Sequence, residues 1–508
     1  MNALPQHPRK HLTILKSLGT VFLPLLIAAC ASVKAPLEPA LESPTPTLEF
    51  CTKWFEQLDT VVDRAGVRDA GAYRIPGFPY LRVDRFSVSF RDQVKDNSVA
   101  FDAWLARLGK LDSEARGYEI RNLPSHFFPF AGIGDQAAAN RTTKICAAQF
   151  AREDLGDAAR RDLLVDRAEV PDNYANWKRV LGLYPIASIP FSKSVERWQQ
   201  ETAEAFRKAD VETGSGTGVV RYESSAKPAG EEKITAIFQR PNTDALGIPQ
   251  FTDAERELLF LAYAPAYEIE TTGEYDRFGP LSWRNGPAPE VDATRPAVYR
   301  RLAFTRFYGK ILTQLVYTIW FPERPFSSDT DLLAGKLDGL VFRVTLGIDG
   351  APLVYDTMHP CGCYHMFFPT ARVKPLPAPE PGVEWAFAPL RLAAIAPAQR
   401  LAVRIASRTH YVVDVRPDTG ASAIAYQFAD DNDLRALPDA DHGTRSAFGP
   451  GGIVPGTGRG ERFLFWPMGI DNPGAMREWG SHATAFIGRR HFDDADLIER
   501  RFEPSSGG

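Results

Sequence analysis

Residues 359–365 hold the densest cluster of side chains that can bind a metal ion or act as nucleophiles. The segment is His359-Pro-Cys-Gly-Cys-Tyr-His365, so His359, Cys361, Cys363 and His365 occupy alternate positions. Imidazole nitrogen and thiolate sulfur together are typical ligands of Zn²⁺ or copper. Covalent haem attachment needs two residues between the cysteines, and this segment has one. A metal-dependent hydrolytic site is therefore one hypothesis for this chain.

The spacing limits how such a metal ion would be held. On a straight strand, alternate residues share a face, with neighbours about 6.6–7 Å apart and the two ends about 20 Å apart. Ligands of one zinc ion lie within about 3–4 Å of each other. Pro360 and Gly362 could bend the chain enough for two or three of the four side chains, and His482 or His491 would supply a missing ligand.

Each of these side chains also has a purely structural explanation. Cys361 and Cys363 would form a tight disulfide or remain buried thiols, and the histidines at both ends of the segment would make ordinary hydrogen bonds. His491 would cap the following turn or pair with Asp493 or Asp494. Both interpretations stay open from the sequence.

Strands are the elements expected to position this segment. Leu340–Leu346 and Pro352–Tyr355 flank Ile348-Asp-Gly350, and Asp-Gly favours a tight hairpin turn. Aromatic and β-branched residues predict an earlier hairpin of long strands about Gly309. Its strands are Leu302–Phe307 and Ile311–Phe321, and further strands are expected at 233–239, 400–405, 410–415 and 422–428.

The earlier hairpin also carries a possible ligand groove. Its basic and aromatic side chains could line a groove for an anionic or sugar ligand: Arg300, Arg301 and Arg306 with Phe304, Tyr308, Tyr317 and Trp320. The pattern favours a simpler alternative, a sheet with one aromatic core face and one charged face.

Helical periodicity dominates the preceding part of the chain. Phe50, Trp54, Leu58 and Val61 recur at helical spacing, as do Phe101, Leu105 and Leu108 after Asn97. A glycine-rich break at 213–218 separates this part from the strands. We predict an α+β fold, with a helical part at 49–209 on or beside a mainly antiparallel sheet domain at 219–508. Thr252-Asp-Ala-Glu255 predicts a capped helix within that domain, and Asp494–Phe502 a final short helix.

Cys51 and Cys146 both lie on predicted helices of the N-terminal part. In an oxidising compartment we expect them to pair, closing a loop of about 95 residues, for about 4 kcal/mol in the chain-entropy treatment. Two buried free thiols are the alternative.

The first thirty residues have the order of an export signal. Arg9, Lys10 and Lys16 precede a short apolar run, Leu18–Leu26, and small residues follow it. Ile27-Ala-Ala-Cys30 resembles the lipobox of bacterial lipoproteins, although the first position there is usually Leu. The resemblance implies cleavage after residue 29 and lipidation of Cys30 with two or three acyl chains, enough for stable anchoring.

The lipidated cysteine is expected to be followed by a tether and by a residue that decides which membrane receives the protein. Pro36, Pro39, Pro44 and Pro46 keep residues 30–48 extended, to a reach of roughly 50 Å at about 3.1 Å per residue. The family's inner-membrane retention signal is typically Asp after the cysteine. Ala31 stands there instead, so the resemblance implies the outer membrane, with the folded part expected to face the periplasm.

Charge argues against nucleic acid as a partner. Without residues 1–29 the chain has 56 basic and 63 acidic residues, a net charge of −7, and it has no long basic run. The sequence thus leaves two functional hypotheses. One is a lipid-anchored envelope lipoprotein that binds a partner or serves a structural role. The other is a metal-dependent periplasmic hydrolase that uses the 359–365 segment.

Overall fold

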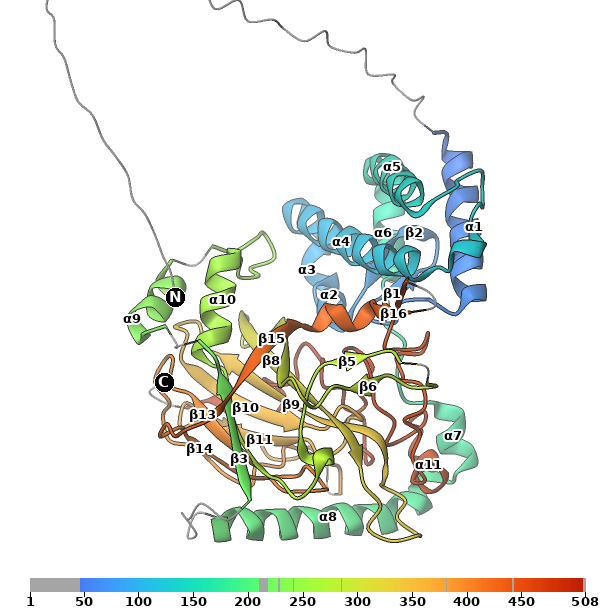
Figure 1. The fold of residues 1–508 in the computed structure, drawn as a ribbon. Helices are drawn as coiled ribbons and strands as arrows, with labels where there is room; N and C mark the ends of the chain where they lie inside the picture. The colour runs from blue at the N-terminus through green and yellow to red at the C-terminus, as the bar shows by residue number, and fades with distance from the viewer. Residues whose placement is uncertain are drawn as a thin grey trace, which may run out of the picture. The chain divides into compact units, whose positions relative to one another are not determined.

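The computed structural model describes residues 46–505, except for 210–217, 227–228, 241, 285, 381 and 441–442. The signal segment at 1–29, Cys30 and most of the tether lie outside the described residues. Pro46–Gly508 form one compact unit. Its helices and its large, mainly antiparallel sheet confirm the predicted α+β class (Figure 1). Within the described residues, no helix is both long enough and apolar enough to cross a membrane.

The chain begins with a helical part. The side chain of Asn97 caps α4, as its position before the apolar repeat predicts, and the side chain of Thr47 caps α1 in the same way. The small sheet β1 (Tyr73–Ile75) and β2 (Phe78–Val83) packs against α4. The helices are α1 (Leu48–Ala65), α2 (Arg85–Val88), α3 (Arg91–Lys95), α4 (Ser98–Asn122), η1 (Ser125–Phe127), α5 (Gln136–Gly156), α6 (Ala158–Arg167), α7 (Asn176–Leu181) and α8 (Tyr184–Ala209).

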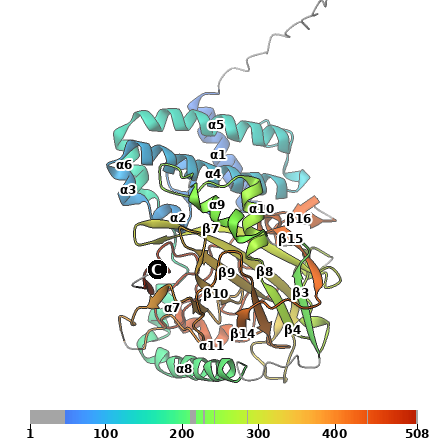
Figure 2. The ribbon, with the colours of Figure 1, turned by 90° about the vertical axis from the view of Figure 1, so that its left-hand side faces the viewer.

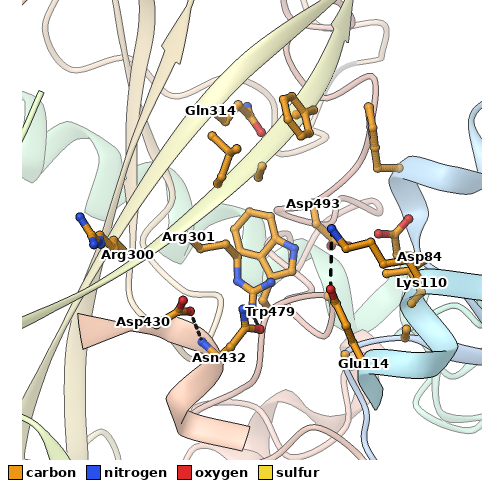
Figure 3. Close-up of a pocket in the computed structure, with 18 of the residues that line it drawn as sticks. Asp84, Lys110, Glu114, Arg300, Arg301, Gln314, Asp430, Asn432, Trp479 and Asp493 are labelled. Carbon is orange, nitrogen blue, oxygen red and sulfur yellow. Dashed lines mark hydrogen bonds and ion pairs between the residues drawn. The ribbon is translucent and has the colours of Figure 1, made fainter. Parts of the chain in front are cut away.

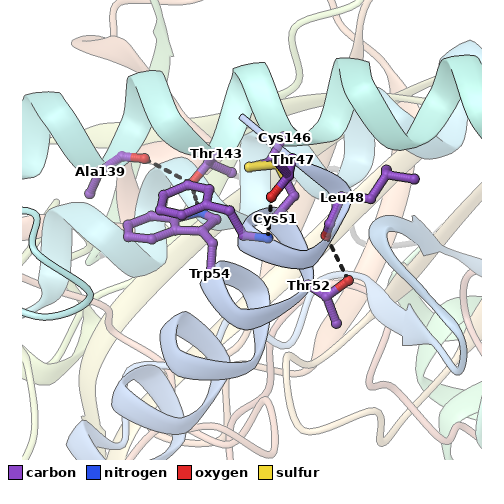
Figure 4. Close-up of a disulfide and its surroundings, with 9 residues drawn as sticks. Thr47, Leu48, Cys51, Thr52, Trp54, Ala139, Thr143 and Cys146 are labelled. Carbon is purple, nitrogen blue, oxygen red and sulfur yellow. Dashed lines mark hydrogen bonds between the residues drawn. A yellow bond between two sulfur atoms is a disulfide. The ribbon is translucent and has the colours of Figure 1, made fainter. Parts of the chain in front are cut away.

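A disulfide joins α1 to α5. The sulfurs of Cys51 and Cys146 are 2.08 Å apart, and both residues are fully buried. Trp54 packs beside the bridge, and its indole N–H donates to the Thr143 hydroxyl at 3.2 Å (Figure 4). The bridge therefore lies inside the apolar core of the helical part.

Ten strands form the main sheet, in the order β11-β10-β9-β8-β7-β15-β3-β4-β13-β14. The first five are antiparallel, and β15 joins them to β3 through parallel pairs on both sides. Both expected hairpins are present, as β7–β8 and β9–β10. The strands are β3 (Val219–Ser224), β4 (Ala266–Glu270), β7 (Ala297–Phe307), β8 (Lys310–Arg324), β9 (Gly335–Leu346), β10 (Pro352–Met358), β11 (Met366–Pro369), β13 (Leu401–Ile405), β14 (Val412–Pro417) and β15 (Ile424–Asp430).

Both faces of this sheet are covered. Helices α9 (Glu231–Gln239) and α10 (Asp253–Ala262) pack on one face, where Leu259 and Phe342 belong to the main core, and α8 contacts the edge strand β14. The C-terminal segment covers the other face, where Phe492 packs on Val316 and Val341. Figure 2 shows the sheet with α1 and α3–α6 beyond one end and α7, α8 and α11 (Arg462–Phe465) beyond the other.

Short elements complete the fold. They include the predicted capping box of α10, in which Thr252 and Glu255 bond each other's backbone N–H. The remaining elements are η2 (Glu274–Asp276), β5 (Leu281–Ser282), β6 (Glu290–Val291), β12 (Val373–Pro375), η3 (Asp431–Arg435), β16 (Leu437–Asp439), β17 (Gly443–Arg445), η4 (Trp466–Met468) and β18 (Phe502–Pro504).

Two local predictions are wrong. Residues 233–239 form helix α9, because Ile234, Ile237 and Phe238 recur at helical spacing and pack on the main core. Residues 494–501 form a run of turns, not the predicted helix, and Phe502 begins strand β18. There Leu497, Ile498 and Phe502 must all reach one apolar cluster, and the backbone bends to bring them in.

Candidate functional site

A cleft of about 640 Å³ lies between the helical part and the sheet. Its volume falls within the range of small-molecule sites, about 300–1,000 Å³. Side chains from α4, α10, β7, η3 and the loop at 478–480 line it, so segments from the whole chain meet there (Figure 3).

Two helices line the cleft with polar side chains at helical spacing. Helix α4 contributes Arg107, Lys110, Leu111 and Glu114. Helix α10 contributes residues with the same spacing, Asp253, Arg256, Glu257 and Phe260. Positions i, i+3, i+4 and i+7 share one face of a helix, so each helix turns one face to the cleft.

Strand β7 contributes two fixed arginines. The guanidinium of Arg300 pairs with Glu257 of α10 at 2.6 Å. Arg301 Nε donates to Asp431 Oδ2 of η3 at 2.7 Å. Gln314 of β8 is also in the cleft wall, and its amide donates to Thr345 at 3.0 Å. These contacts hold the polar groups of the cleft in place before any ligand binds.

Trp479 stands in the middle of the labelled side chains in Figure 3. Its side chain is partly exposed, and its ring packs against Phe492 with 5.8 Å between centroids. The guanidinium carbon of Arg301 lies 5.7 Å from the indole centroid. The indole therefore offers a supported aromatic surface inside a polar cleft.

Two buried carboxyl groups, those of Glu478 and Asp493, line the cleft together with Trp479. Burial, together with repulsion from Asp69, raises the pKa of Glu478 to about 8, although Arg435 is 4.0 Å away. Burial also raises the pKa of Asp493, despite its ion pair with Arg85 at 3.3 Å. Glu478 is consequently mostly protonated near neutral pH and can donate a hydrogen bond.

The basic side chains of the cleft are paired. Seven basic and seven acidic side chains line it, and one of the acidic groups is the mostly protonated Glu478. Each described basic side chain of the lining has a carboxylate neighbour, so none of these cations is uncompensated. The pairs are Arg85–Asp493, Arg107–Asp84, Lys110–Glu114, Arg256–Asp253, Arg300–Glu257, Arg301–Asp431 and Arg435–Asp69.

The 359–365 segment lies elsewhere, in a buried tight turn between β10 and β11. Gly362 has φ +89°, and a Cβ there would lie 2.4 Å from the Ala483 carbonyl oxygen, so only glycine fits. The turn sends its two histidines to different partners. His359 Nδ1 bonds Asp338 at 3.1 Å, and His365 Nε2 bonds Asp356 at 2.8 Å.

Burial lowers the pKa of both histidines, that of His365 to about 3, so both stay neutral at physiological pH. Asp338 also binds His410, whose Nδ1 lies 2.8 Å from Asp338 Oδ2. Arg343 binds Asp356 through two bonds of 2.9 and 2.6 Å. These contacts match the structural explanation of ordinary hydrogen-bonded histidines.

The other proposed ligands are also separated. Cys361 and Cys363 are free thiols, and the backbone N–H of Cys363 donates to the Cys361 sulfur at 3.4 Å. His491 lies 3.3 Å from both Asp172 and Asp494, and His482 is buried near Phe492. Across the part of the chain that the structure describes, no three His, Cys, Asp or Glu side chains are grouped as metal ligands.

Only some of the residues suggested to line a groove at the earlier hairpin lie in the cleft. Arg300, Arg301 and Phe304 do line the cleft. Tyr317 and Trp320 are buried in apolar cores, as the alternative interpretation expects. The other two lie outside the cleft lining: Tyr308 is in the exposed turn after β7, and Arg306 packs on Phe90.

Sequence reasoning missed Glu478, Trp479 and Asp493. The sequence signal that could have indicated the cleft was the row of charged residues at helical spacing on α4 and on α10, which a search for catalytic motifs does not detect. Comparisons add no further guide, because no family model, curated protein or solved structure matches this chain.

Proposed function

We propose that this chain is a lipid-anchored envelope protein whose cleft binds a neutral oligosaccharide. The observation that carries the binding proposal is the partly exposed indole of Trp479, surrounded by paired polar side chains in a cleft of ligand size. The proposal develops the binding hypothesis from the sequence and gives it a ligand class.

The chemistry of a sugar suits this cleft. A pyranose ring has C–H-rich faces that pack on an aromatic ring, and hydroxyls that both donate and accept hydrogen bonds. Trp479 provides the aromatic face. Carboxylates such as Asp430 accept hydrogen bonds, guanidinium groups such as Arg301 donate them, and the amide of Asn432 does both.

Charge balance favours a neutral ligand over a phosphate or a nucleotide. An anion would have to displace a carboxylate from an arginine, for example Glu257 from Arg300 at 2.6 Å. That exchange loses one ion pair for each pair gained. A hydroxyl can instead bond the free edges of both partners without separating them.

Anchoring rests on Ile27-Ala-Ala-Cys30 and on the proline-rich tether that follows. We propose that lipid on Cys30 holds the folded unit at the outer membrane, facing the periplasm. In that place the cleft would meet envelope glycans or oligosaccharides entering the periplasm.

A glycan array tests the binding proposal. Residues 31–508 are exported without the lipid, labelled, and compared with Trp479→Ala. Trp177→Ala is the matched control, because Trp177 is 61% exposed and outside the cleft. We expect binding to neutral glycans that Trp479→Ala abolishes and Trp177→Ala preserves. Binding confined to acidic glycans, or no binding at all, would reject the proposal.

The metal-dependent hydrolase hypothesis gains no specific support. Its proposed ligands point to separate partners: His359 to Asp338, His365 to Asp356, and His491 to Asp172 and Asp494.

A further inference from the structure

Exposed apolar side chains concentrate on one surface of the folded unit. Among the described residues, half of the exposed large apolar side chains lie on α7, the start of α8, and α11 with the turn after it. The first two elements and the turn between them contribute Trp177, Val180, Leu181, Leu183, Ile186 and Ile189. The third region contributes Phe463, Leu464 and Trp466. We call these nine side chains the apolar patch.

The elements that carry the apolar patch contact one another although they are far apart in the sequence. The rings of Phe191 in α8 and Phe465 in α11 are 5.1 Å apart. At the start of α7, the backbone N–H of Ala175 donates to the Gly469 carbonyl at 2.7 Å. Lys178 pairs with Asp471 at 2.7 Å. These contacts hold α7, α8 and the segment around α11 next to one another.

Such a surface is costly in water. Val180 is 72% exposed, Phe463 69% and Leu181 68%. Covering apolar surface stabilises a protein by about 25 cal/mol per Å². Soluble proteins rarely expose large contiguous apolar patches, and those that do use them to bind partners or membranes.

We infer that the apolar patch rests on a phospholipid bilayer. Its composition is that of an interfacial surface, with tryptophans among aliphatic side chains and basic residues beside them. Lys178 Nζ lies 5.6 Å from the Trp177 ring, and the guanidinium of Arg462 lies 4.6 Å from the Phe463 ring. Arg462 would attract anionic lipid headgroups by about 1 kcal/mol, whereas Lys178 shares its charge with Asp471.

The length of the tether bears on this inference. Thr47 caps α1, and Figure 1 shows α1 in the upper part and α7 and α11 in the lower part of the right-hand edge of that view. Residues 30–48 reach roughly 50 Å at about 3.1 Å per residue. This step rests on the proposed lipidation of Cys30, which would keep that edge near the membrane.

Flotation with vesicles tests the inference without the lipid anchor. The unlipidated chain 31–508 is mixed with vesicles of phosphatidylethanolamine and phosphatidylglycerol in a 3:1 ratio. The patch variant is Leu181→Glu with Ile186→Glu. The control is Val99→Glu with Ile348→Glu, which adds the same charge at positions 65% and 62% exposed. We expect flotation of the wild type and the control, and at least a tenfold lower bound fraction for the patch variant.

Three results would overturn the inference. The first is a wild type that fails to float, and the second is a patch variant that floats as well as the control. The third is a wild-type dimer, seen by light scattering, that the patch variant converts to a monomer, because a second copy would then cover the patch. None of these results depends on glycan binding or on Cys30, so this inference and the proposed function fail separately.

Discussion

The guanidinium of Arg301 lies between the indole of Trp479 and the carboxylate of Asp431. Its carbon is 5.7 Å from the indole centroid, and its Nε donates to Asp431 Oδ2 at 2.7 Å. Strand β7, η3 and the C-terminal segment thus meet at one side chain, which fixes the aromatic surface of the cleft.

Changing Arg301 to Lys should weaken glycan binding modestly. A lysine cannot bond Asp431 through Nε and also present a flat cation to Trp479. A cation–π contact of this kind is worth about 0.5–1 kcal/mol, so the dissociation constant should rise about twofold to fivefold. Asp431→Asn should have a similar effect, and the double variant should add little to either. Fully additive effects, measured by calorimetry, would show that the two residues act independently.

Glu478→Gln should change how stability depends on pH. The folded chain holds the proton on Glu478 with a pKa of about 8, above the ordinary value of 4.5. The stabilisation from this group is complete below pH 4.5 and is lost as pH rises through about 8. Between these values the wild type should lose up to about 1.4 kcal/mol per pH unit relative to the variant.

Urea unfolding at pH 5, 6.5 and 8 measures this difference. Glu49→Gln is the control, since the Glu49 side chain is 78% exposed. If Glu478→Gln and wild type keep a constant difference across the three pH values, the carboxyl is not protonated in the folded chain.

Asp356→Asn should destabilise the fold strongly. Its carboxylate is completely buried and holds both Arg343 and His365. Removing one partner of a buried ion pair costs about 3–5 kcal/mol, because the remaining charge stays buried. Asp349→Asn is the control, since its pair with Arg372 is exposed and should contribute at most about 1 kcal/mol. Similar unfolding free energies for both variants would contradict the account of this core.

Loss of the disulfide should also be measurable. Cys51→Ala with Cys146→Ala should lower the free energy of unfolding by about 2–5 kcal/mol, mainly because the unfolded chain gains freedom. Reductant should lower the stability of the wild type and leave the variant unchanged. The denatured, unreduced chain 31–508 should titrate two thiols, Cys361 and Cys363. Four thiols would show that the bridge is absent.

The sequence was most informative where the signal was local. Asn97 and Thr252 cap helices with their own side chains, and Asp349-Gly350 forms its turn within one hairpin. The strand prediction for 233–239 was wrong because the β-branched residues of this segment suit a strand, whereas its packing on the sheet required a helix.

The cleft could not be predicted in the same way. Its ion pairs join residues that are distant in the chain, such as Arg85 with Asp493 and Arg301 with Asp431. The raised pKa of Glu478 comes from burial beside Asp69, which only the folded chain produces. Conversely, the dense 359–365 segment looked like a metal site because sequence spacing does not show that Asp338 and Asp356 bind its histidines.

The most direct measurement is a calorimetric titration of unlipidated 31–508 with the neutral oligosaccharide that binds most tightly on the array. The account predicts one site per chain. It also predicts a dissociation constant at least tenfold higher for Trp479→Ala, about 1.4 kcal/mol, and an unchanged value for Trp177→Ala. Equal affinities for wild type and Trp479→Ala would place the ligand outside the cleft and contradict the proposed function.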